Sequence, residues 1–156
     1  MILYHGSYTA ILQPDLEHSR AAVDFGKGFY LTPIESQAKK WCEKHSRRWA
    51  KRVVSKFELA DEKLSSLRVL EFKSYSEEWL DFIVSCRSGQ DHSAWDIVIG
   101  GVANDKVFDT LELFFDGLAT KEQTIDRLRL EEPNLQVCLR TPAALAALQY
   151  LGAEEL

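Results

Sequence analysis

Apolar residues follow two different periods along this chain, and the periods predict its elements. Short apolar or alternating runs predict strands at residues 2–5, 27–32, 53–59, 67–72, 95–102 and 134–141. Helical spacing predicts helices at residues 33–52, 76–87, 105–117, 120–130 and 142–151. The strands neither alternate regularly with helices nor form an unbroken series, so the pattern indicates an α+β fold. No internal repeat or linker interrupts it, and we expect one domain over residues 1–156.

The predicted helix at residues 33–52 has the most detailed pattern. It begins with "TPIE", in which Thr32 is an N-cap, Pro33 takes the first helical position and Glu35 completes a capping box. Its apolar face is Ile34, Ala38, Trp41, Cys42, His45 and Trp49. A basic stripe on the other side is Lys40, Lys44, Arg47 and Lys51, widened by Arg48. Such a stripe is usually the solvated side of a helix, although it can also meet a pyrophosphate, an acidic target or nucleic acid.

Composition narrows the class of protein. With 156 residues and 46% hydrophobic residues, the chain can bury a core without disulfides or metal. A net charge of −5 argues against a protein that coats nucleic acid. The three cysteines are odd in number and far apart, which is typical of reduced thiols in the cytoplasm. The apolar runs are too short to span a membrane, and we expect neither a signal peptide nor a membrane partner.

Candidate chemistry begins at the end of the first predicted strand. His5 precedes Gly6, so a ring nitrogen stands beside backbone groups that no side chain shields. Two further glycines flank Lys27, and Tyr30 follows with a flat face that can stack on a heteroaromatic ring. Taken singly, these residues suit a strand histidine, turn glycines and a core tyrosine. Together they describe a slot for a flat, hydrogen-bonding ring attached to a sugar.

Two stretches, "YHGSYT" and "FGKGFYLTPIESQAKKWC", resemble the diphtheria-toxin and poly(ADP-ribose) polymerase branch of the ADP-ribosyltransferase superfamily. That branch has His-Gly with Ser or Thr on its first strand, a glycine-rich segment leading to tyrosine, and a helix with a second aromatic residue. The chain is also similar to small bacterial transferase-like proteins, some of them toxins, that share segments like "DFGKGFYLT", "DIVIGGVAND" and "NLQVCLRT". The match needs no gap over residues 25–42 and covers mainly the N-terminal third.

The resemblance implies a split β-sandwich with flanking helices and the transfer of one ADP-ribose unit from NAD to a macromolecule. A toxin or effector of this kind would modify a protein rather than a nucleic acid, and a cognate antitoxin could restrain it. His5 would bind a hydroxyl of the adenosine-side ribose and Gly6 the nicotinamide amide. Tyr30 and Trp41 would cover the two faces of the nicotinamide ring. The NAD contacts implied are His5, Gly6, Ser7, Gly28, Tyr30 and Trp41.

The third catalytic residue departs from the family pattern. Active members of the branch place a glutamate on a late strand, where it stabilises the cationic transition state. The corresponding residue here is Gln136, so the resemblance implies the catalytic set His5, Tyr30 and Gln136. An uncharged amide disfavours chain elongation and rapid NAD hydrolysis. An NAD-binding pseudoenzyme that acts through a partner and an NAD glycohydrolase stay open as alternatives. The alternative acids are Glu112, Glu131 and Glu132, and no histidine or cysteine spacing suggests a metal.

Overall fold

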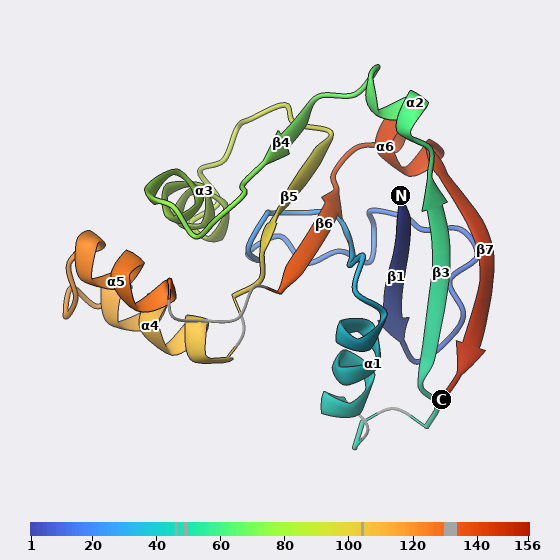
Figure 1. Cartoon of the computed structure of the whole chain (residues 1–156), viewed down its shortest axis with the longest axis horizontal. Coiled ribbons are helices and arrows are strands. Elements are labelled where there is room, and N and C mark those ends of the chain that lie inside the picture. The colour runs from blue at the N-terminus through green and yellow to red at the C-terminus, as the bar shows by residue number, and fades with distance from the viewer. Residues whose placement is uncertain (46, 49, 104, 130–133) are drawn as a thin grey trace.

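A computed structural model describes residues 1–156 apart from 46, 49, 104 and 130–133. The described residues form two sheets, which confirms the α+β class (Figure 1). The three-stranded sheet has the order β1 (Ile2–Ser7), β3 (Val53–Leu59) and β7 (Leu148–Glu155), all antiparallel. The four-stranded sheet has the order β2 (Phe29–Leu31), β6 (Leu135–Leu139), β5 (Ile97–Gly101) and β4 (Val69–Glu71). Only the pair of β4 and β5 is parallel.

Six helices accompany these sheets in the described part of the chain. They are α1 (Glu35–Lys44), α2 (Asp61–Leu64), α3 (Glu77–Arg87), α4 (Asp105–Phe115), α5 (Lys121–Leu128) and α6 (Pro142–Ala146). Figure 1 shows α3, α4 and α5 on the side of the four-stranded sheet that faces away from the other sheet. Helix α1 packs instead beside β1 and β3.

The core has two main parts because the four-stranded sheet is covered on both faces. Between the sheets, Leu3 and Phe57 meet Leu139. On the other face, Trp79 and Leu111 of the helices pack against Val98. All of these side chains are fully buried, and burial of a side chain of this size contributes about 1.5–3 kcal/mol.

Strand β6 shows how alternation selects the two faces. Leu135, Val137 and Leu139 belong to the core between the sheets. Cys138 belongs to the core under the helices, and Gln136 shares its parity. The sequence prediction that Gln136 points away from its apolar neighbours is therefore confirmed.

The first strands of the two sheets meet at one backbone bridge. Tyr4 of β1 donates its N–H to the Thr32 carbonyl at 2.8 Å and accepts from the Thr32 N–H at 2.9 Å. The Thr32 hydroxyl accepts from the Ile34 N–H at 3.1 Å, one residue before the helix, so Thr32 is not the N-cap. Helix α1 begins at Glu35 instead, and its N-cap residue Ile34 makes no side-chain cap. The predicted start at Thr32-Pro33 was therefore wrong.

The predicted helix over residues 33–52 was also too long, because α1 ends at Lys44. The basic stripe is consequently not one helical face: Lys40 and Lys44 lie on α1, whereas Arg47 and Lys51 follow it. Lys51 pairs with Glu155 of β7 at 3.0 Å. Residue 49, assigned above to the apolar face, lies outside the described residues.

The C-terminal prediction was wrong in a different way. Residues 142–151 were expected to form one helix, but α6 ends at Ala146 and β7 begins at Leu148. Strand β7 pairs with β3, and Leu148 and Tyr150 pack against the core between the sheets. Pairing with an existing strand outweighs the helical preference of the alanines and leucines, as local propensity is a weak constraint.

Candidate functional site

The imidazole of His5 has a defined tautomer. Its Nδ1 lies 2.7 Å from the Tyr30 carbonyl oxygen, which can only accept, so Nδ1 carries the proton. Burial lowers the pKa of His5 below its ordinary value, although the hydrogen bond to Tyr30 opposes this shift. The ring is therefore neutral at pH 7, and Nε2 has a free lone pair. We find no partner for Nε2 among the described residues, so His5 can accept a hydrogen bond from a hydroxyl group.

Gly6 is buried, and its backbone polar groups lie along the edge of β1 that faces away from β3. The backbone groups of Tyr4 point away from β3 towards Thr32, and residues two apart on a strand point to the same side. The Gly6 N–H and C=O therefore also point away from β3. Gly6 lies two residues beyond Tyr4, which forms the bridge to Thr32. No described group bonds to either one. A donor and an acceptor side by side match a primary carboxamide.

The absence of a side chain at Gly6 lets α1 approach the strand closely. A Cβ atom at this position would lie 2.6 Å from the Ala38 carbonyl oxygen and 2.8 Å from Cys42 Sγ. The same atom would lie 3.4 Å from Cδ1 of Trp41, so the indole stands directly beside Gly6. Trp41 remains 44% exposed and packs edge-on against His45. The structure thus brings Gly6 and Trp41 together at one end of β1. The adjacent His5 side chain points to the other face of the strand, towards Phe29.

Tyr30 lies on the opposite side of the backbone from His5. Its ring packs against the core under the helices, and its hydroxyl donates to the Gly26 carbonyl at 2.6 Å and accepts from the Phe25 N–H at 3.0 Å. Burial raises the pKa of Tyr30, so the hydroxyl stays protonated. We find no ring contact between Tyr30 and Trp41 in the described part of the structure. The stacking of both on one ligand ring stays a prediction.

The other two predicted contacts are occupied by local hydrogen bonds. Ser7 is buried and donates its hydroxyl to the Thr9 carbonyl. Gly28 donates its N–H to Ser19 Oγ at 2.7 Å, and the same hydroxyl lies 2.8 Å from the Gly28 carbonyl oxygen. These two hydrogen bonds connect Ser19 to the glycine loop, which we define as residues Asp24–Gly28. Neither arrangement tests whether Ser7 or Gly28 contacts NAD.

Gln136 does not join His5 in the structure. Its side chain is 8% exposed and faces the helices, where Nε2 lies 3.2 Å from Asp24 Oδ2 and 3.3 Å from the Gly101 carbonyl oxygen. The imidazole of His5, in contrast, lies against Phe29 in the core between the sheets, with ring centroids 4.5 Å apart. The predicted catalytic side chains are therefore not gathered in one place, and the catalytic role of Gln136 stays a prediction.

The alternative acids give no better third residue. Glu112 is exposed on α4, and residues 131 and 132 lie outside the described residues. Across the described residues, no three His, Cys, Asp or Glu side chains gather as a metal site requires. No described helix is long and apolar enough to span a bilayer. Cys42, Cys86 and Cys138 are buried and free, and burial raises the pKa of Cys86 and Cys138 to about 12, which makes both thiols unreactive.

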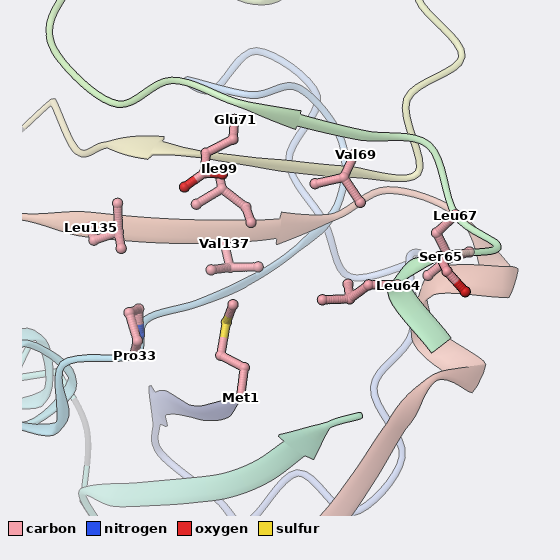
Figure 2. A pocket seen from close by; sticks show the side chains of 10 residues that line it. All are labelled: Met1, Pro33, Leu64, Ser65, Leu67, Val69, Glu71, Ile99, Leu135 and Val137. Atoms are coloured by element: carbon pink, nitrogen blue, oxygen red, sulfur yellow. The ribbon is translucent and has the colours of Figure 1, made fainter. Parts of the chain in front are cut away.

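A separate apolar groove opens between the two sheets near Met1. It has a volume of about 670 Å³. Figure 2 shows the side chains around it, with Leu135 and Val137 from β6, Ile99 from β5 and Val69 from β4. Met1 lies at the start of β1, whereas His5 and Gly6 lie towards its other end. The lining of the groove includes none of the residues for which NAD contacts were predicted, so we do not assign NAD to this groove.

Sequence reasoning missed three residues that hold the neighbouring elements together. Asp24 accepts hydrogen bonds from Arg87 and Gln136, and Gln37 of α1 makes two hydrogen bonds with the Leu135 backbone. Asp24 directly precedes the glycine motif, and that position was a usable signal. Arg87 and Gln37 carry no such signal, because each looks like an ordinary polar residue of an amphipathic helix.

The chain matches one family model over residues 1–150. That family is described as "Protein of unknown function (DUF3990)". No curated protein matches the chain.

Proposed function

The chain belongs to the DUF3990 family, and we propose that it is an NAD-dependent mono-ADP-ribosyltransferase. The observation that carries the proposal is the end of β1, where no described group bonds to the N–H or C=O of Gly6 and the exposed indole of Trp41 lies beside them. A nicotinamide ring requires both features: a donor and acceptor for its carboxamide and a flat apolar surface for its ring. The resemblance in "YHGSYT" and "FGKGFYLT" gives the same assignment from sequence.

His5 adds the acceptor that a ribose requires. Its neutral ring keeps Nδ1–H on the Tyr30 carbonyl and leaves Nε2 to accept a hydrogen bond from a ribose hydroxyl. Two small sheets joined by the Tyr4–Thr32 bridge, with α1 beside the first strand, are compatible with the split β-sandwich of this superfamily. We therefore include that fold in the proposal.

The proposed reaction breaks the bond between the nicotinamide nitrogen and C1′ of the ribose. Nicotinamide leaves with the bonding electron pair, and a nucleophile of the acceptor donates a pair to C1′ and loses its proton to water. Binding the carboxamide at Gly6 and the adenosine-side ribose at His5 would hold NAD at both ends and so orient the bond that breaks between them. Because no carboxylate is assigned to the slot, we propose single transfer to a good nucleophile rather than chain synthesis. A macromolecular acceptor, protein rather than nucleic acid, belongs to the same proposal.

The direct test measures nicotinamide release and labelled ADP-ribose transfer with and without a cell extract as a source of acceptor. His5→Asn is the sharpest variant, because the amide N–H can still donate to the Tyr30 carbonyl while the Nε2 acceptor is lost. We expect kcat/KM for nicotinamide release to fall about 10- to 100-fold. Lys63→Ala, on the exposed end of α2, is the control and should match wild type. Equal activity of His5→Asn and wild type would remove His5 from the site.

A second candidate is a pseudoenzyme that binds NAD or ADP-ribose without turnover. It is favoured by one observation, the inward side chain of Gln136, which leaves no acidic group assigned to the slot. Calorimetric titration separates the two candidates. NAD binding that Trp41→Ala weakens, with no nicotinamide release by wild type, would select the pseudoenzyme. Release of free ADP-ribose without transfer would instead select an NAD glycohydrolase.

A further inference from the structure

One buried carboxylate joins the glycine loop to three other segments. Asp24 Oδ1 accepts from Arg87 Nη2 at 2.5 Å and from Arg87 Nε at 3.2 Å. Its Oδ2 accepts from the Ala103 N–H at 3.1 Å and from Gln136 Nε2 at 3.2 Å. The Asp24 side chain is only 13% exposed and that of Arg87 20%. Asp24 thereby connects three segments at one point: the end of α3, the segment after β5, and β6.

The chain of contacts continues from this carboxylate to the candidate site. Asp24 is followed directly by Phe25 and Gly26, whose backbone groups are bonded to the Tyr30 hydroxyl. The carbonyl of Tyr30 in turn accepts from His5 Nδ1. Gly26 has φ of +72°, a conformation that other residues adopt at a cost, so the loop is held in one particular shape. The position of the loop and that of the His5 ring are thus mechanically linked.

The chemistry of the neighbours dictates both side chains. All four groups around Asp24 are donors, so both of its oxygens must accept, and only a carboxylate meets that requirement. The Nε2 of Gln136 faces the opposite situation, because Asp24 Oδ2 and the Gly101 carbonyl are both acceptors. An amide supplies the two N–H groups that they need, whereas an ionised glutamate would supply none. This accounts for glutamine at a position where the resembling family has glutamate.

We infer that Asp24 is a positioning residue for the NAD slot and that Gln136 acts through it rather than on the substrate. The identity of the ligand as NAD rests on the proposed function. The positioning itself concerns only the loop Asp24–Gly28. Removing an acceptor from Asp24 should loosen this loop, shift Tyr30 and disturb the orientation of His5. A residue that merely stabilised the fold would lower the amount of folded protein and leave the KM of the remainder unchanged.

The test uses Asp24→Asn, with Asp109→Asn as a matched control on the exposed face of α4. Lys27 is exposed within the loop, so trypsin cleavage after Lys27 under native conditions reports its opening, with cleavage after Lys63 as the internal reference. We expect cleavage at Lys27 to be about tenfold faster in Asp24→Asn, relative to the reference, and unchanged in Asp109→Asn. The KM for NAD should rise about tenfold in the folded fraction.

Two further variants keep the test decisive if Asp24→Asn does not fold. Arg87→Lys keeps one charged donor to Asp24, and Gln136→Leu removes one of the four donors. In both variants, cleavage at Lys27 should be faster than in wild type and slower than in Asp24→Asn. Wild-type cleavage at Lys27 in Asp24→Asn and Gln136→Leu would overturn the inference, as would faster cleavage with an unchanged KM. Wild-type protein that neither binds nor cleaves NAD would overturn the proposed function, and cleavage at Lys27 would then decide alone whether Asp24 holds the loop.

Discussion

Gln136→Glu is the substitution that the family resemblance favours and the structure opposes. The change replaces the Nε2 donor by an oxygen that faces Asp24 Oδ2 at 3.2 Å and the Gly101 carbonyl oxygen at 3.3 Å. When ionised, the introduced carboxylate has no proton to donate and repels the charge on Asp24. Water cannot replace the lost donors easily, because the side chain at this position is only 8% exposed. We therefore expect the substitution to destabilise the fold.

The magnitude follows from the two lost hydrogen bonds. The hydrogen bond to the charged Asp24 contributes about 1.5–3 kcal/mol and the one to the Gly101 carbonyl about 0.5–1.5 kcal/mol. Neither acceptor is left without a donor, because Asp24 retains Arg87 and the Ala103 N–H and the Gly101 carbonyl retains Trp79 Nε1. The free energy of unfolding should therefore fall by about 2–4 kcal/mol at pH 8. Protonation of the introduced carboxyl restores a donor, so its folded-state pKa lies above the unfolded value of about 4.3.

The sign of the pH dependence is fixed by this raised pKa. Stability associated with a raised folded-state pKa is present below the unfolded pKa and is lost as the pH rises through the folded one. One pKa unit corresponds to about 1.4 kcal/mol. A stability loss of about 2–4 kcal/mol therefore develops between about pH 4.3 and pH 6–7 and stays constant at higher pH.

Urea denaturation followed by tryptophan fluorescence measures the effect at pH 4.5 and pH 8 for wild type and Gln136→Glu. Gln136→Leu is the control, because it also lacks the donors but does not titrate. We expect the deficit of Gln136→Glu relative to wild type to be larger at pH 8 by about 1–3 kcal/mol and that of Gln136→Leu to be nearly equal at both pH values. Wild-type stability of Gln136→Glu at pH 8, or a deficit that does not change with pH, would refute the reasoning.

Three further substitutions test neighbouring contacts. Gly6→Ala places Cβ 2.6 Å from the Ala38 carbonyl oxygen, so α1 must shift, and we expect a loss of about 1–3 kcal/mol in urea unfolding; an unchanged midpoint would contradict the close packing. Tyr30→Phe leaves a loop N–H without its acceptor and should cost about 1–3 kcal/mol, which a thermal melt against wild type would reveal or disprove. Ser19→Ala removes both hydrogen bonds to Gly28, so hydrogen exchange at the Gly28 amide should accelerate, and exchange at the wild-type rate would argue against that tie.

The sequence by itself determined most of the elements and the place of the histidine-glycine pair. Hydrophobic period is a local property, so strands β3 and β5 and helices α3 and α5 could be read from neighbouring residues. The same alternation fixed the two faces of β6 and sent Gln136 away from Leu135 and Val137. It also placed Gly6 near the end of a strand, although β1 continues through Gly6 to Ser7, two residues beyond the predicted end.

Only the tertiary structure decided which residues meet. Strand β7 forms where the local sequence favours a helix, because β3 offers it a backbone to pair with. Asp24 meets Arg87 and Gln136 across separations of 63 and 112 residues, and no local pattern encodes contacts of that range. The edge of β1 at Gly6 likewise has no described partner strand because the bridge to Thr32 is formed by Tyr4 alone. Periodicity determines which face of an element a side chain occupies, whereas the packing of distant segments determines which residue it contacts there.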